Sequence, residues 1–286
     1  MKSLAFFSCV LATGAALASA VTSETTFGVL KVASTNAQTV ISVPWEAVGT
    51  SGSDIKVKDF VKTTDMTDGD ELYLYDSGSQ SYKMWVLDGS ENPHWVGTTT
   101  VTKKKTNITA TAGDDGEDDT IARGQALIIV RANYNSGTTP APAIYLYGQY
   151  NSTGVTEYGM AYATNAVKNT LFAPVNTTGE IMYLNPVSAS DIDSGKKVVA
   201  ASSWANVYKR DVIKVQDEKG NAIFLSWDNT NSKWGVYDAF ANSGAGGWDY
   251  DSAVIQPGMG AWYQAYKYDS RAGAPKLTTT TVTGTK

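Results

Sequence analysis

The sequence predicts an all-β protein with two tandem homologous domains, each a small β-sandwich or β-barrel, after a cleaved signal peptide. Three observations support this prediction. Short runs of β-branched and aromatic residues alternate with turns rich in Gly, Asn, Asp and Ser, which is the pattern of strands and hairpins. A set of motifs recurs in the same order later in the chain. The opening of the chain has the composition of a secretory signal.

Residues 1–20 have the three parts of a signal peptide. Lys2 supplies the positive start, Leu4–Leu17 is the apolar stretch, and Ala18–Ala20 is a small-residue cleavage site. The apolar stretch is shorter than the ~20 residues that a membrane-spanning helix needs. We therefore predict a secreted or cell-envelope protein, extracellular or periplasmic, without a transmembrane segment. The single cysteine, Cys9, lies in the signal, so we expect a mature chain without a disulfide.

The mature chain reads as strands and turns. One β-branched or aromatic run ends in the turn Asp76–Ser79, whose residues tolerate positive φ. A continuous apolar run such as Ala126–Val130 is typical of a strand that is covered on both faces. We expect strands over 72–75, 82–87, 126–130 and 144–147, and helix only in short pieces over 54–62 and 188–192.

An internal duplication divides this chain into two domains. Five matches in one order, with an offset that drifts, indicate one fold with different loop lengths. The domains are expected over 21–150 and 151–286. The end of the chain, Lys276–Lys286, is either the closing strand of the second copy or a frayed tail. The matches include Thr39–Pro44 with Asn169–Pro174, Gly69–Asp76 with Arg210–Asp217, Trp85 with Trp227, Trp95 with Trp234, and Ile121–Gly124 with Ile255–Gly258.

The late motif of the second copy, Pro257–Trp262, reads Pro-Gly-Met-Gly-Ala-Trp. With an early strand ending in Pro, a Gly-Asp hairpin and a Trp hairpin, it resembles the repeats of secreted proteins from planctomycete- and verrucomicrobium-type bacteria. The first copy departs from this motif, because Ala122–Leu127 lacks the Pro, the second Gly and the Trp. The resemblance covers nearly all of the mature chain and implies secretion and a β-repeat fold. It implies no activity.

Composition excludes several classes of function. With 23 basic and 28 acidic residues, the formal net charge is -5, which disfavours a nucleic-acid binder. One histidine and one cysteine do not make a Cys/His zinc site. His94 lies in a turn-rich stretch, has no counterpart in the second copy, and is expected to be an exposed loop residue rather than a catalytic base. We therefore predict a protein that is not an enzyme.

Two groups of carboxylates still offer chemistry. Asp70, Asp76, Asp211 and Asp217 recur in both copies, and they suit either turn capping or, less well, a carboxylate-dependent hydrolase. The second group forms a dense acidic run that is expected to be a solvated loop, with a calcium site as the alternative. That run contains Asp114, Asp115, Glu117, Asp118 and Asp119. Calcium is the one cofactor that the sequence suggests.

The tryptophans suggest a ligand. Aromatic faces with Asn and Asp nearby are the usual chemistry of sugar binding, because a pyranose has an apolar face and a polar edge. Trp95, Trp234 and Trp248 lie near turns and are expected to be exposed candidates for glycan contact. We expect Trp85, Trp227 and Trp262 to be buried in the core. Gly258 and Gly260 permit a bulge that would turn the Trp262 side chain inward.

These patterns support two main functions. The first is a non-enzymatic structural subunit of a surface layer, matrix or filament, because edge strands of such domains can pair between subunits. Its expected partners are copies of itself or other cell-surface components. The alternative is a glycan-binding or adhesion module with a polysaccharide as partner. A hydrolase ranks third, and no nucleic-acid partner is expected.

Overall fold

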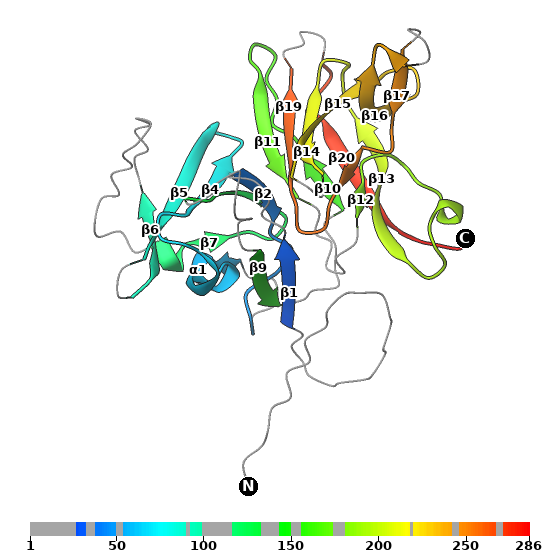
Figure 1. Ribbon diagram of the computed structural model, residues 1–286. Helices are drawn as coiled ribbons and strands as arrows, with labels where there is room; N and C mark the ends of the chain where they lie inside the picture. Colours follow the sequence, from blue (N-terminus) through cyan, green and yellow to red (C-terminus); the bar gives the residue numbers. More distant parts are fainter. Residues whose placement is uncertain are drawn as a thin grey trace.

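The computed structural model describes residues 27–32, 38–49, 54–89, 92–98, 116–132, 143–149, 156–173, 181–217, 220–241, 246–266 and 271–286. Strands dominate these residues and helix is confined to short pieces, which confirms the all-β prediction (Figure 1). The predicted signal peptide lies outside the described residues. Among the residues that are described, no helix is both long enough and apolar enough to cross a membrane.

The first half of the chain forms a five-stranded antiparallel sheet and two separate strand pairs. Side chains alternate between its faces, as the pleat requires. The sheet order is β2 (Gln38–Ser42), β8 (Ala126–Val130), β4 (Glu71–Asp76), β5 (Ser81–Asp88) and β6 (His94–Thr98). The pairs are β1 (Phe27–Val32) with β9 (Ile144–Gln149) and β3 (Ile55–Lys56) with β7 (Thr120–Ile121).

The second half forms two sheets. The larger one has the order β11 (Lys168–Phe172), β19 (Ala261–Ala265), β14 (Val212–Gln216), β15 (Ala222–Asp228), β16 (Lys233–Asp238) and β17 (Gly247–Asp249). The other has the order β10 (Glu157–Gly159), β20 (Lys276–Thr283), β13 (Lys197–Ala205), β12 (Met182–Tyr183) and β18 (Val254–Ile255).

The two halves follow the same strand path. The order β2-β8-β4-β5-β6 of the first half corresponds strand by strand to β11-β19-β14-β15-β16 of the second. The first and last strands of each half also pair, β1 with β9 and β10 with β20. Of the two alternatives for the end of the chain, the closing strand is the one present, as β20. Common descent of the halves stays a prediction, since strand order alone does not establish it.

The halves differ in the segment that follows the short strand β3 in the first half and the short strand β12 in the second. In the first half the chain enters helix α1 (Val57–Phe60), and the next residue, Val61, bridges to β9. In the second half it passes through the 3-10 helix Ala189–Asp191 and then forms β13, which lies between β12 and β20. Both helical pieces fall inside the ranges that the sequence predicts, and each is shorter than expected.

The two halves lie side by side (Figure 1), and a shared apolar layer packs between them. Its buried members from the first half are Tyr75, Ala126 and Ile128, and those from the second half are Leu171 and Ala173. The larger core cluster also contains residues of both halves. Continuous burial of this kind stabilises one joined body rather than two lobes on a hinge.

Glutamine side chains close a sheet edge in each half. The Oε1 atom of Gln216, at the end of β14, accepts a hydrogen bond from the Val40 amide at 3.0 Å, and its Nε2 atom donates to the Gln38 carbonyl at 3.2 Å. In the reverse direction, Gln80 accepts from the Asn169 amide at 2.8 Å and donates to the Asn169 carbonyl at 3.0 Å. Each half therefore satisfies backbone groups on the edge strand of the other, β2 or β11.

The late glycine motif has a different role from the expected bulge. Gly258 has a φ of +75°, and a Cβ atom there would lie 2.6 Å from the Val32 side chain of the first half. A Cβ atom on Gly260 would lie 2.9 Å from Ala126. Between them, Met259 bridges to β2 as an added antiparallel neighbour. The glycines are needed because Gly258 has a positive φ and because this turn packs closely against side chains of the other half.

Candidate functional site

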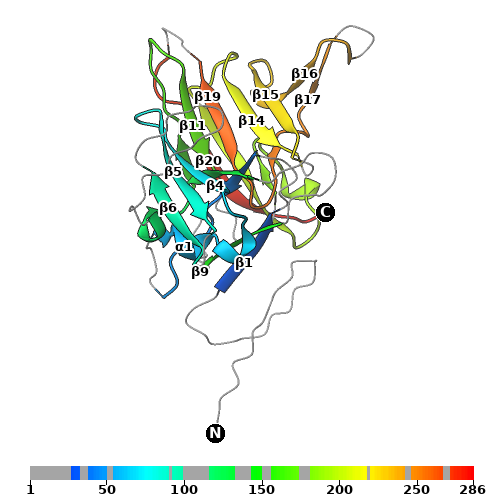
Figure 2. The same ribbon diagram turned by 60° about the vertical axis from the view of Figure 1, so that its left-hand side comes forward.

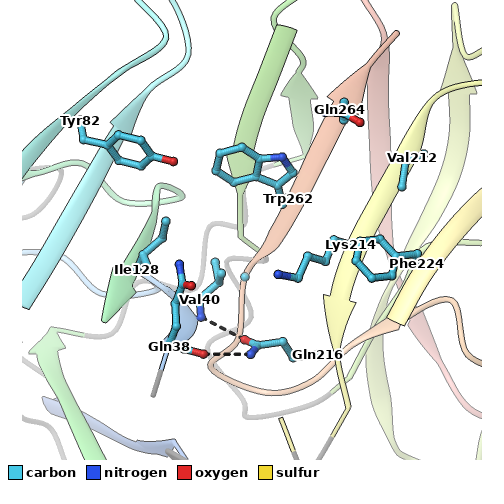
Figure 3. Close-up of a pocket in the computed structure, with 11 residues that line it drawn as sticks. Gln38, Val40, Tyr82, Ile128, Val212, Lys214, Gln216, Phe224, Trp262 and Gln264 are labelled. Carbon is cyan, nitrogen blue, oxygen red and sulfur yellow. Dashed lines mark hydrogen bonds between the residues drawn. The ribbon is translucent and has the colours of Figure 1, made fainter. Parts of the chain in front are cut away.

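An open cleft of about 430 Å³ lies between the two halves (Figure 3). One wall comes from strands β2, β8 and β5 of the first half, and the other from β14, β15 and β19 of the second. The shared apolar layer and the Gln216 bonds lie beside it and hold the walls together. The lining residues are Gln38, Val40, Tyr82, Ile128, Val212, Lys214, Gln216, Phe224, Gly260, Trp262 and Gln264.

The wall from the second half is one face of a pleated sheet. Lys214 is paired in register with Trp262 on β19 and with Phe224 on β15, so the three side chains form a row across three strands. The next residues along these strands point to the opposite face, where Ile213 and Tyr263 are fully buried. Alternation therefore sends the row into the cleft, and Phe224 remains 62% exposed.

Aromatic rings connect the walls. The Trp262 ring centroid is 5.0 Å from that of Tyr75, which in turn is 4.8 Å from that of Tyr82. Tyr75 is buried beneath this cluster, whereas Tyr82 is 43% exposed and faces the cleft opposite Trp262 (Figure 3). Burial raises the pKa of Tyr82, with a further contribution from Tyr75, so its hydroxyl stays protonated and able to donate near neutral pH. The cleft thus presents two partly open rings from two halves.

Polar groups are spaced around these rings. Gln264 lies two residues beyond Trp262 on the same face of β19, and its Nε2 atom is 3.4 Å from Oδ1 of Asn169. Gln38 is exposed at the first position of β2. The Lys214 ammonium group points from β14 into the cleft (Figure 3). These groups offer hydrogen-bond donors and acceptors along the rim of an aromatic site.

The tryptophans predicted as surface residues are the main correction. Trp95 and Trp234 are both 0% exposed, so the expectation of surface contact is wrong for these two. Trp234 lies 5.4 Å from Trp227 and 5.5 Å from Trp204, measured between ring centroids, in the core of the second half. Turn residues near each tryptophan suggested exposure, but the strands turn both side chains inward. Trp85 is fully buried, as expected.

Trp262, which was assigned to the core, is half-buried: it packs against the shared apolar layer and also lines the cleft. The only local signal for exposure is its alternation with Ala261 and Tyr263, both 0% exposed, which places it on the other face of β19. Whether that other face is covered depends on the first half of the chain. The sequence analysis therefore missed Trp262, along with Tyr82 and Lys214, as candidate site residues.

Trp248 lies on a second aromatic surface, the hairpin of β16 and β17 (Figure 2). Its ring is 5.1 Å from that of Tyr237, which is 53% exposed, and is parallel to that of Tyr250 at 6.1 Å. Phe240, in the turn two residues beyond β16, is 87% exposed. Figure 2 shows this hairpin projecting from the sheet. Of the three predicted glycan contacts, only Trp248 reaches the surface.

The described part of the acidic run is held by lysines. Asp118 lies 2.8 Å from both Lys56 and Lys58, and hydrogen bonds from these lysines lower its pKa to about 2. Asp119 accepts a hydrogen bond from the Trp85 indole at 2.6 Å and pairs with Lys83 at 2.6 Å.

Glu117 belongs to the 3-10 helix Gly116–Asp118, and Asp114 and Asp115 lie outside the described residues. Among the residues that the structure places, no group of three or more potential ligands converges on one point. The calcium site remains a prediction.

The recurring carboxylates are structural in position. Asp211 is 0% exposed, accepts from Tyr263 at 2.7 Å, and forms a two-pronged pair with Arg271 at 2.6 and 3.0 Å. Asp70 is likewise 0% exposed and pairs with Arg131 at 3.0 Å. Each accepts one backbone amide just before the central strand, as the capping interpretation predicts, and a second from the residue stretch after β8 or β19.

Asp76 and Asp217 accept hydrogen bonds within exposed turns. Each lies six residues along an extended strand from Asp70 or Asp211, about 20 Å away. Paired glycosidase carboxylates are ~5–9.5 Å apart, so these pairs do not have that geometry.

The single histidine, His94, is the first residue of β6 and is half-buried, so it is not the exposed loop residue that the sequence predicts. Its Nδ1 atom lies 2.9 Å from the Asn92 carbonyl oxygen.

A scan against protein-family models, a search of curated proteins and a search of solved structures each found no match to this chain. The resemblance to secreted bacterial repeat proteins therefore stays a prediction, and the argument about function depends on the site itself.

Proposed function

We propose that this protein is a secreted, non-enzymatic glycan-binding protein whose ligand lies in the cleft between the two halves. The observation that carries the proposal is the pair of partly open rings, Trp262 and Tyr82, on opposite walls of the cleft. A pyranose can place its apolar face against one such ring while its hydroxyl groups reach neighbouring polar side chains. Gln264 and Gln38 supply amides of that kind beside the rings.

The size and chemistry of the cleft support binding rather than catalysis. Its volume of about 430 Å³ falls in the ~300–1,000 Å³ range of ligand pockets. The described lining offers amides, aromatic rings, aliphatic groups and one lysine. Hydrolysis of a glycoside by the usual route uses two carboxylates, and the described lining residues include none.

A structural subunit is the second candidate, and the β16–β17 hairpin favours it. Phe240 and Tyr237 are exposed there, and β17 is the last strand of its sheet. Exposed apolar side chains beside a sheet edge suit contact with another copy. We rank this function lower because the edges of β2 and β11 are already bonded to glutamines of the opposite half.

The test is retention on a panel of immobilised polysaccharides by the chain that begins after Ala20. We expect the unaltered protein to bind at least one glycan, and Trp262→Ala to lower affinity at least tenfold through loss of ring stacking. Trp262→Phe should recover part of this loss. Phe224→Ala changes an exposed wall residue and should weaken binding without affecting folding.

The matched control is Trp248→Ala, which removes a surface tryptophan from the projecting hairpin and should leave affinity unchanged. Circular dichroism and a thermal melt verify folding of each variant. Failure of the unaltered chain to bind any polysaccharide would overturn the proposal. So would full retention by Trp262→Ala and Phe224→Ala together with loss by Trp248→Ala, because the hairpin would then be the binding surface.

A further inference from the structure

We infer that the bound glycan carries a carboxylate, and that Lys214 recognises this group as a uronic acid residue in an otherwise sparsely charged polysaccharide. The inference rests on the proposed function and adds the chemical class of the ligand. Its basis is the distribution of charge in the cleft, the position of Lys214 in the row with Trp262 and Phe224, and the net charge of the chain.

Lys214 is the only charged residue among the described residues that line the cleft. Every other lining side chain is an amide, a phenol, an indole, a phenyl ring or an aliphatic group, and Gly260 has no side chain. None of the ion pairs among the described residues involves Lys214. The cleft therefore holds one ammonium group whose partner can come from the ligand.

The position of Lys214 suits a sugar that is already stacked. It is the cross-strand neighbour of Trp262 and of Phe224, so its ammonium group lies beside the aromatic surface rather than at a distant rim. Lys214 extends into the cleft on the side of Trp262 (Figure 3), so we expect it to reach the ring substituents of a pyranose that stacks on Trp262. Partial enclosure between apolar walls strengthens a charge-assisted hydrogen bond to a carboxylate.

The charge of the whole chain limits the ligand further. The formal net charge is -5, which repels densely anionic polymers at long range. Heavily sulfated polymers are bound by clusters of basic side chains, whereas the described lining of the cleft has a single basic side chain, Lys214. A single carboxylate within a mainly neutral glycan matches one ammonium group flanked by aromatic rings. An acidic peptide fits less well, because the paired rings suit a pyranose face.

The probe is glucuronoxylan, a neutral xylan backbone with sparse uronate side groups, compared with the same material after chemical reduction of its carboxyl groups. Affinity is measured by calorimetry with the unaltered chain at low and at moderate salt. We expect the reduced polymer to bind about tenfold more weakly, which is the size of one charge-assisted hydrogen bond in a partly enclosed site. Added salt should narrow this difference.

Lys214→Gln should lower affinity for the native polymer to that for the reduced polymer, and leave the latter unchanged. Lys214→Arg should keep the preference. The control is Lys83→Gln, which makes the same charge change on the opposite face of β5 from Tyr82. Because Lys214→Gln still binds the neutral polymer, a folding defect is distinguishable from a lost contact.

The outcomes separate the two proposals. Equal affinity of the unaltered chain for native and reduced polymer would overturn the uronate inference and leave glycan binding intact. Tighter binding to dextran sulfate than to glucuronoxylan would also overturn it, in favour of a sulfate ligand. Binding to a polyglutamate peptide, with no binding to any polysaccharide, would overturn both.

Discussion

The outer faces of the two central sheets are used differently. In the first half, most of the face that meets the second half is covered, with Ile128 4% exposed and Tyr75 7% exposed, and Tyr82 at the cleft remains 43% exposed. In the second half, the matching face carries Lys214 and Phe224, and Phe224 is 62% exposed. The strand order is the same in both. The difference shows that the contact between the halves covers one end of the second sheet and leaves the rest as a cleft wall.

A second comparison concerns the aspartate that opens the central strand of each half. Asp70 and Asp211 are both fully buried and both bond to an arginine, but the arginines come from different places. Arg131 directly follows β8, whereas Arg271 lies six residues beyond β19. Each half thus places an arginine beside this buried aspartate, although at different positions in the chain, because a buried carboxylate without a nearby cation is unfavourable.

The largest expected effect is a loss of stability when the buried aspartate of either half, Asp211 or Asp70, is replaced. Asp211→Ala should lower the free energy of unfolding by about 3–5 kcal/mol, because it leaves the Arg271 charge buried without its main partner. Asp70→Ala should cost less, because removal of Asp211 also takes the acceptor away from the buried Tyr263 hydroxyl. Urea denaturation followed by tryptophan fluorescence measures both variants. Asp217→Ala, in an exposed turn, is the control, and an equal or greater loss for Asp70→Ala would contradict the ranking.

A smaller effect is expected at the glutamines that join the halves. Gln216→Ala frees the backbone of β2 and Gln80→Ala frees that of β11, and each should cost about 1–2 kcal/mol. Gln216 also lines the cleft, so only Gln216→Ala should weaken glycan binding. Urea denaturation measures the stability of both variants, and the polysaccharide assay tests whether only Gln216→Ala loses affinity. A loss of affinity in Gln80→Ala equal to that in Gln216→Ala would show that both act through the contact between the halves.

The smallest expected effect is on stability at acidic pH. It compares Asp118, which pairs with lysines, with Asp191, which is bonded to a serine hydroxyl. The pKa of Asp118, in the first half, is lowered to about 2 by hydrogen bonds from Lys56 and Lys58. The pKa of Asp191, in the second half, is lowered chiefly by the Ser188 hydroxyl. Because each folded-state pKa lies below the ordinary value of 3.8, each carboxylate stabilises the fold above about pH 4 and loses this effect as the pH falls.

Denaturation midpoints of the unaltered chain and of Asp118→Asn should therefore differ slightly at pH 6 and converge near pH 2. Moderate salt should shrink the difference at pH 6, because the lysine contacts are exposed. The same comparison for Asp191→Asn should respond less to salt. A salt-independent difference for Asp118→Asn would indicate that hydrogen-bond geometry, rather than charge, dominates there.

Local patterns predicted a good part of this fold. Alternating β-branched and aromatic runs located the central strands, and the apolar run 126–130 corresponds to β8, whose first four residues are buried. The capping role of Asp70 and Asp211 followed from their position before a strand. These features were predictable because a pleat, a turn or a capped amide involves residues that are close in the sequence.

The candidate site was not predictable in the same way. Tyr82 belongs to β5 of the first half, whereas Lys214 and Trp262 belong to β14 and β19 of the second half, and the three meet only at the cleft. The sequence by itself determined that Trp262 and Lys214 alternate with buried residues and so share the outer face of their sheet. Only the tertiary structure decided what covers that face. The bond between Gln216 and Val40 joins residues 176 positions apart, and the position of the first half over the second follows from contacts at that range. Exposure of a side chain is a property of such contacts, which no local pattern records.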